Sequence, residues 1–129
     1  MAKKKIILCD TGVLIEHFHG NQSIVRELDA LGFERLSISV ISVGEIYFGM
    51  RKRETASTRD LIRRFNLLHI DKTTSQTFIQ LMPGYKSKGI SVPDALIAAT
   101  APTQRVELFT LNRSDFNFIE GLTLYNPPF

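Results

Sequence analysis

The amino-acid sequence predicts an α/β sandwich in which helices flank a central, mainly parallel sheet. Short runs of apolar residues are typical of strands that are covered on both faces of such a sheet. Segments with helical spacing alternate with those runs, which is the order expected of parallel strands joined by helices. With 129 residues the chain is long enough for one core and too short for two, so we expect a single domain over residues 1–129.

The first half of the chain is expected to contain two strands and three helices. Residues 5–9, KIILC, form the first short apolar run. Helical patterns follow over residues 12–20 and 23–32, and each of them ends at a glycine. Residues 36–40 alternate apolar and polar side chains, and residues 43–50 return to helical spacing. A strand is therefore expected to run directly into a helix there.

The second half continues the alternation of helices and strands. The expected elements are a polar helix over residues 57–65, a strand over 66–70, a helix from about residue 74 that is bent or broken near Pro83 and Gly84, a helix over 91–101, a strand over 106–111, a helical turn over 112–121 and a last strand over 122–125. The helix SVPDALIAATA is almost wholly apolar, so it must be buried.

The composition is that of a globular chain. Hydrophobic residues make up 43% and charged residues 22%, without low-complexity tracts or repeats, which excludes disordered and solenoid classes. Only four apolar residues separate the basic start MAKKK from Asp10, and no run approaches the length of a membrane span. We therefore expect a cytoplasmic protein with no membrane association. The single cysteine, Cys9, cannot form an internal disulfide, which fits a reducing compartment.

Four acidic residues stand at junctions between the predicted elements: Asp10, Glu45, Asp94 and Asp115. In an open parallel sheet, ligand sites form outside the carboxyl ends of the strands. We therefore expect the four carboxylates to meet at one edge of the sheet. Carboxylates held close together repel each other and take up protons unless positive charge lies between them. A divalent cation would supply that charge, and oxygen-only ligands indicate Mg2+ or Mn2+.

Each acid also has a structural explanation, because a Ser or Asn three residues before an acid matches or imitates the helix capping box. Such pairs are Ser42 with Glu45, Ser91 with Asp94, and Asn112 with Asp115. Asp10 or Thr11 would likewise cap the helix that follows the first strand. Capping explains each acid singly, but it does not explain why all four converge.

The charge distribution indicates a polyanionic partner. The net charge is +3, from 16 basic and 13 acidic residues. If four acids bind a metal, nine acidic residues remain against the 16 basic ones. Six basic residues are expected to bind RNA: Arg51, Lys52, Arg53, Arg59, Arg63 and Arg64. The alternative for this cluster is a solvated helix face.

The four acidic motifs resemble those of the PIN-domain ribonucleases, and especially the VapC-type toxins of toxin–antitoxin pairs. The opening Asp-Thr motif resembles LCDTGVLIEHF, and the Glu motif resembles SVISVGEIYFGM. The third acidic motif resembles VPDALIAATA, and the last resembles LFTLNRSDFNFIEGLTL. The four motifs occur in this order over almost the whole chain, which makes the resemblance specific.

The resemblance implies a PIN-like sandwich and a metal-dependent endoribonuclease that hydrolyses RNA phosphodiester bonds, with Mg2+ or Mn2+ as cofactor. It assigns catalysis and metal binding to Asp10, Glu45, Asp94 and Asp115. Supporting groups would be Thr11, Thr110 and Asn112. The implied partners are the RNA substrate, a VapB-like antitoxin and a second copy of the chain in a homodimer. The apolar segments VLIEHF and ISVGEIYFGM, if they are not ordinary core, would receive the antitoxin.

Two positions depart from the family pattern, and two other readings compete with it. Gly12 stands where many relatives have Asn or Ser, and Pro83 interrupts a helix that is smoother in the family. A haloacid dehalogenase-type phosphatase would need an acid at position 12. Cys9 and the three histidines are interpreted as structural or solvent-facing residues. The stronger alternative is a non-catalytic PIN-fold module that binds RNA or protein.

Overall fold

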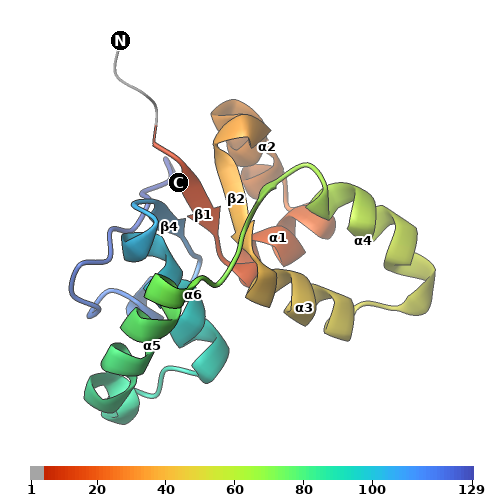
Figure 1. The fold of residues 1–129 in the computed structure, drawn as a ribbon. Coiled ribbons are helices and arrows are strands. Elements are labelled where there is room, and N and C mark those ends of the chain that lie inside the picture. The colour runs from red at the N-terminus through yellow and green to blue at the C-terminus, as the bar shows by residue number, and fades with distance from the viewer. Residues whose placement is uncertain (1–4) are drawn as a thin grey trace.

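The computed structural model describes residues 5–129, in which helices alternate with short strands (Figure 1). The elements in chain order are β1 (Ile7–Cys9), α1 (Thr11–Phe18), α2 (Gln22–Leu31), β2 (Leu36–Ser39), α3 (Val40–Gly49), α4 (Thr55–Ile62), β3 (Asn66–Leu68), α5 (Lys72–Tyr85), α6 (Val92–Thr103) and β4 (Glu107–Phe109). Short 3-10 turns lie at Phe33–Arg35, Lys52–Glu54, Lys86–Lys88 and Arg113–Asp115.

The four strands form one parallel sheet in the order β3-β2-β1-β4. Strand β1 is central, with Ile7 opposite Leu36 of β2 on one side and opposite Glu107 of β4 on the other. Because every strand points the same way, all four carboxyl ends reach one edge of the sheet. The predicted α/β fold with a parallel sheet is confirmed.

The core has two halves, because successive residues of a strand point to opposite faces of the sheet. Ile7 and Cys9 of β1 are fully buried against α1 and α2, where Leu14 and Leu28 pack. Leu8 is fully buried on the other face against α6 and β4. The central strand is therefore covered on both sides, which is why every residue of β1 is apolar.

Helix α6 is apolar because it packs against the sheet and against α5. Its buried residues are mostly alanines, together with Ile97, and such small side chains allow close approach to the sheet. Ser91 caps the helix, and Pro93 lies in its first turn, where a missing N–H costs nothing.

None of the helices within residues 5–129 combines the length and the apolar character that crossing a bilayer requires.

Two details differ from the sequence prediction. Residues 122–125 do not form a strand, because Leu124 makes only a single parallel bridge to Leu108 of β4. Two backbone hydrogen bonds form this bridge, one from Leu108 N to the carbonyl of Thr123 and one from Tyr125 N to the carbonyl of Leu108. Helix α5 runs through Pro83 and ends at Tyr85, so the interruption predicted near Pro83 and Gly84 falls at the end of the helix. It starts at Lys72, where the carboxylate of Asp71 accepts a hydrogen bond from Thr74 N at 2.7 Å.

Candidate active site

Asp10 lies directly after the central strand, and both of its carboxylate oxygens are held. Its Oδ1 accepts from the backbone N–H of Thr11 at 2.8 Å, which caps α1. Its Oδ2 accepts from the hydroxyl of Thr110 at 2.9 Å. Only 5% of the Asp10 side chain is exposed. The fold therefore fixes this carboxylate in one orientation at the carboxyl edge of the sheet.

Thr110 follows β4 and is buried beside Asp10. While its hydroxyl donates to Asp10, its oxygen accepts from the backbone N–H of Asn112 at 3.1 Å. The structure therefore places Thr110 in direct contact with Asp10. Asn112 contributes through its backbone, and its side chain is exposed.

Glu45 is brought to the site by the direct passage from β2 into α3. Its Oε1 lies 2.8 Å from the hydroxyl of Thr11, so Thr11 contacts Asp10 through its backbone and Glu45 through its side chain. The proposed capping box of Ser42 with Glu45 is wrong. Helix α3 begins at Val40 and is capped by Ser39, whose Oγ accepts from the backbone N–H of Ile41.

Asp94 and Asp115 complete the group from the other side of the sheet edge. Asp94 lies in the first turn of α6, and its backbone N–H donates to Ser91 Oγ at 3.2 Å. Ser91 is thus the cap, as the capping explanation required, while the Asp94 carboxylate is half-buried at the edge. Asp115 ends the 3-10 turn at Arg113–Asp115 and is exposed.

The electrostatics show that the four carboxylates share one region. Burial raises the pKa of Asp10, and the negative charges of Asp94 and Glu45 raise it further, against the lowering effect of its hydrogen bonds to Thr110 and Thr11. Burial also raises the pKa of Asp94, with added contributions from the charges of Glu45 and Asp115. Asp10 and Asp94 therefore each lie in the negative field of other acids, and among residues 5–129 no basic side chain contributes to either pKa shift.

The chemistry of this donor set fits a hard divalent cation. Carboxylate oxygens are the ligands that Mg2+ and Mn2+ prefer, and Mg2+ commonly binds one or two protein carboxylates and keeps several waters. Within residues 5–129, no three His, Cys, Asp or Glu side chains stand close enough together to enclose an ion by themselves. Asp10, Glu45, Asp94 and Asp115 could therefore hold a hydrated cation better than a bare one.

The other chemically reactive side chains lie elsewhere. Cys9 is fully buried in the core, and burial raises the pKa of its thiol, so it is the small core residue that the sequence predicts. His17 packs edge-on against Phe33, and burial lowers its pKa, as does the nearby charge of Arg64. An added Cβ at Gly12 would meet no atom within 4 Å, so this departure leaves open space beside Thr11.

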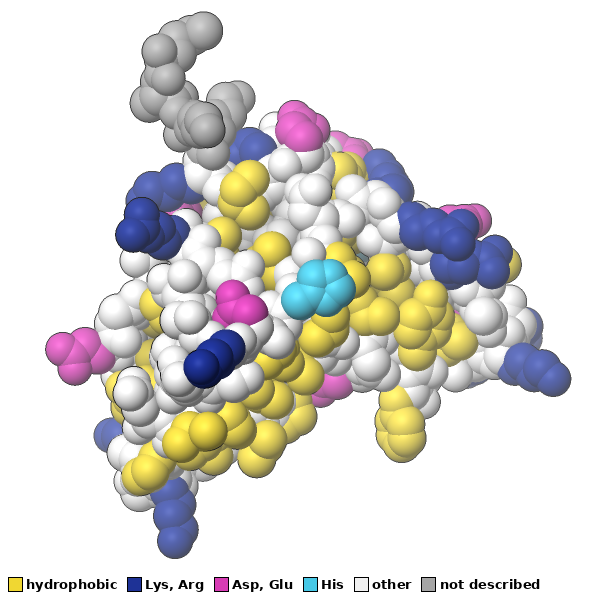
Figure 2. Space-filling model, viewed as in Figure 1, with side chains coloured by type: hydrophobic (Ala, Val, Ile, Leu, Met, Phe, Trp, Pro, Cys, Tyr) yellow, Lys and Arg dark blue, Asp and Glu magenta, His cyan; other side chains and the backbone are white. Residues whose placement is uncertain are grey.

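The six basic residues lie on the 3-10 turn at Lys52–Glu54, on α4 and at their ends. All six are exposed, and none forms a salt bridge within residues 5–129. Figure 2 shows Lys and Arg side chains at the right-hand edge of the molecule, where Figure 1 places α4. Arg64 differs from the rest, because its guanidinium stacks 3.8 Å from the ring centre of Phe33.

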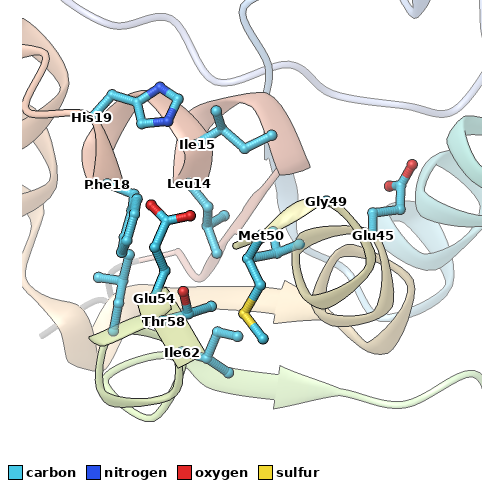
Figure 3. A pocket seen from close by; sticks show the side chains of 12 residues that line it. Leu14, Ile15, Phe18, His19, Glu45, Gly49, Met50, Glu54, Thr58 and Ile62 are labelled. Carbon is cyan, nitrogen blue, oxygen red and sulfur yellow. The ribbon is translucent and has the colours of Figure 1, made fainter. Parts of the chain in front are cut away.

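An apolar groove adjoins the acidic group (Figure 3). It has a volume of about 160 Å³ and lies between α1, α3 and α4. Its walls include Ile15 and Phe18 of α1, Met50 after α3, and Ile62 of α4. Glu45 stands at the end of the groove with its carboxylate directed away from these side chains. Both predicted apolar segments contribute to this groove.

One residue of the site escaped the sequence reasoning. The sequence pattern predicts Ser42 only as a helix cap, but it is fully buried, and its Oγ lies 2.8 Å from the hydroxyl of Thr11. The available signal was three serines, Ser37, Ser39 and Ser42, in an otherwise apolar segment. Buried hydroxyls need partners, so such residues in a core segment indicate a hydrogen-bond network.

Comparison with known proteins identifies close relatives over almost the full length. Residues 7–120 match the PIN domain family. Ribonuclease VapC10 of Mycobacterium tuberculosis is 35% identical over 130 aligned residues, which cover 96% of this chain and 93% of that protein.

Solved structures share the fold. A toxin–antitoxin complex from Klebsiella pneumoniae contains a chain that is 33% identical, with a TM-score of 0.79, covering 94% of this chain and 97% of that one. DNA-bound VapBC from Salmonella typhimurium gives a TM-score of 0.84 at 24% identity, covering 95% and 98% of the two chains. At that identity the second likeness shows the fold alone.

Replacing Asp94 by Asn separates an acidic cluster from a helix cap. The pKa of Asp94 is raised in the folded chain, so its ionised form destabilises the fold at neutral pH, and this cost disappears as the pH falls through the folded pKa. In EDTA at pH 7, Asp94→Asn should raise Tm by roughly 1–3 °C, and the gain should shrink towards pH 4. Thermal unfolding followed by circular dichroism measures both.

Asp71→Asn is the matched control for this prediction. Asp71 also lies at a helix start, but hydrogen bonds from Thr74 lower its pKa, so its charge stabilises the fold above its ordinary pKa. This variant should not melt higher than the parent at pH 7. A lower Tm for Asp94→Asn, as for Asp71→Asn, would mean that the Asp94 carboxylate mainly stabilises the start of α6.

Proposed function

The chain belongs to the PIN-domain family and, within it, groups with the VapC ribonucleases, and on that premise we propose that it is a metal-dependent endoribonuclease toxin. The observation that carries the proposal is the convergence of four carboxylates from separate segments at the carboxyl edge of the sheet. The proposed cofactor is Mg2+, or Mn2+ in its place. Because cellular RNA is the proposed substrate, we place the activity in the cytoplasm.

The proposed roles follow from how firmly each side chain is held. Asp10 is fixed by Thr11 and Thr110, which suits a ligand that orients the cation. Glu45 and Asp94 face it from α3 and α6. Asp115 is exposed, and its carboxylate makes no hydrogen bond within residues 5–129, so it is free to accept a proton from an incoming water. The bound cation would activate water and offset the charge that develops on the phosphate.

A non-catalytic PIN-fold binding module is the alternative. Such a module would need the fold but not an ordered network around its carboxylates. In this structure, Thr11 and Thr110 donate hydrogen bonds of 2.8–2.9 Å to the carboxylates of Asp10 and Glu45. A network that keeps like charges together costs stability, which favours a site retained for binding a cation.

RNA cleavage should require the divalent cation and should leave 5′-phosphate and 3′-hydroxyl ends. No histidine contacts the four acids among the described residues, so the ribose 2′-hydroxyl lacks an activating pair, and water is the expected nucleophile. Asp10→Asn should lower cleavage by roughly 100-fold or more. Gel analysis of end-labelled RNA with and without EDTA measures this. Cyclic-phosphate ends would contradict the mechanism, and RNA binding without cleavage would support the binding module.

The basic cluster is proposed to hold the RNA backbone beside the acids. Exposed arginines on and just after α4, which form no salt bridge within residues 5–129, release counterions when they contact phosphates, so binding should weaken as salt rises. Arg64 is engaged with Phe33, so we expect a smaller contribution from it. Stacking of a guanidinium on an aromatic ring restricts how far it can reach.

Replacing Arg59 and Arg63 together by Gln should flatten the salt dependence of RNA binding. Each lost phosphate contact should lower the slope of log affinity against log salt by about 0.7. Arg26→Gln, an equally exposed change on α2, is the control and should keep the parental slope. Fluorescence anisotropy with a labelled RNA in EDTA gives the slopes. Equal slopes for all three proteins would leave the cluster as a solvated helix face.

An antitoxin is the proposed occupant of the groove between α1, α3 and α4. The Klebsiella relative, which is 33% identical, is described as a toxin–antitoxin complex. The groove walls are mostly apolar, and Ile15 remains 40% exposed there, which suits the apolar face of a helix or a strand. A partner in this groove would lie next to Glu45.

A homodimer is also proposed, through a second face of α3. Phe48 is 95% exposed beside a shallow hollow formed with Val40, Ile41 and Gly44. A phenylalanine exposed to this extent is typical of a surface that binds a partner rather than of a surface that stays in solvent. This face differs from the apolar groove, so a dimer and an antitoxin complex can form together.

Two charge substitutions should separate these partners. Phe48→Glu should convert the parental dimer, of twice the 14.6 kDa chain mass, into a monomer, as light scattering measures. Ile15→Glu should leave the dimer intact but abolish binding of the protein encoded by the neighbouring reading frame, as calorimetry measures. Each variant serves as the control for the other. A monomeric parent would refute the dimer, and unchanged binding by Ile15→Glu would refute the groove.

A further inference from the structure

Ser42 is a buried hydroxyl that neither capping nor the proposed metal site explains. It lies in the first turn of α3 with none of its surface exposed, and α3 is capped by Ser39 instead. Its Oγ lies 2.8 Å from Thr11 Oγ1, and the same Thr11 oxygen lies 2.8 Å from Glu45 Oε1. The three side chains therefore form a chain of contacts that ends at a carboxylate.

The direction of this chain follows from the number of protons. An ionised carboxylate only accepts, so the single hydroxyl proton of Thr11 points to Glu45. Thr11 Oγ1 is also placed to donate to Ser42 Oγ at 2.8 Å, but its one proton cannot serve both acceptors. While that proton is on Glu45, the Ser42 hydroxyl must supply the proton of the contact between Ser42 and Thr11. Ser42 thereby occupies the acceptor side of the Thr11 hydroxyl and keeps the Thr11 proton directed towards Glu45.

We propose that Ser42 is a positioning residue that acts on Glu45 through Thr11. The inference rests on the proposed function and deepens it, since it makes Ser42 a residue that orients Glu45, one of the four proposed metal-binding acids. Outer partners of metal ligands fix ligand orientation in this way. Asp10 has an equivalent arrangement, because Thr110 donates to it while accepting from Asn112 N. Ser42 plays for Glu45 the part that the Asn112 backbone plays for Asp10.

The first test reads the Thr11 side chain in the metal-free protein. NMR scalar couplings to the Thr11 methyl carbon should show one χ1 rotamer in the parent and rotamer averaging in Ser42→Ala. Ser37→Ala is the matched control, since Ser37 is equally buried but donates to the carbonyl of Ile7 at 3.0 Å. This control should keep the single Thr11 rotamer while it loses a comparable hydrogen bond.

The second test reads RNA cleavage in a double-mutant cycle. Ser42→Ala should lower kcat about 10- to 100-fold with KM nearly unchanged, while Ser37→Ala should keep the parental kcat. In a Thr11→Val background, Ser42→Ala should have no further effect, because its route to Glu45 is already removed. If Ser42→Ala does not fold, Ser42→Cys, which keeps the shape with a poor donor, takes its place.

The two tests together decide whether Ser42 positions Thr11. Rotamer averaging together with a non-additive loss of kcat supports the positioning role. A single Thr11 rotamer with parental kcat in the Ser42 variant, or effects that multiply in the Thr11→Val background, would overturn it and leave Ser42 as core packing. If the parent cleaves no RNA, the proposed function fails, and the rotamer measurement alone then decides whether Ser42 orients Thr11.

Discussion

The burial of a carboxylate beside other carboxylates, at the edge of the sheet, is the constraint on which the site depends. Parallel pairing sends the ends of β1, β2 and β4 to one edge, and the buried Asp10 stands at the centre of it. Burial and neighbouring charge both disfavour its ionised form. The surrounding hydroxyl and amide groups reduce this cost without removing it, and a cation is the natural way to remove the rest.

Threonine hydroxyls connect elements that are far apart in the sequence. Thr110 joins the end of β4 to Asp10, and Thr11 joins the start of α1 to Glu45 on α3. Each hydroxyl donates to an acid and has a second polar neighbour behind it. Asp10 and Glu45 are thus oriented by hydroxyl groups from other segments of the chain, and side chains held in this way lose little entropy when they bind a ligand.

Local patterns predicted most of the fold, because helix and strand patterns depend on neighbouring residues, and they singled out the four acids at the junctions between elements. The apolar run before Asp10 and the apolar helix α6 are where the sequence places them. The serine network was missed because its partners are 31 and 34 residues apart. The last strand was predicted wrongly for a related reason: its alternating pattern is genuine, but only a single bridge to β4 forms. Contacts between distant segments decide both cases.

Glu45 belongs to three surroundings at once: the acidic cluster, the end of the apolar groove and the hollow beside Phe48. Any molecule that settles in one of these places changes the environment of the same carboxylate. The binding equilibria at the three surfaces are then thermodynamically linked, and the linkage is reciprocal. Whatever free energy a bound protein adds to or removes from cation affinity, the cation adds to or removes from the affinity for that protein.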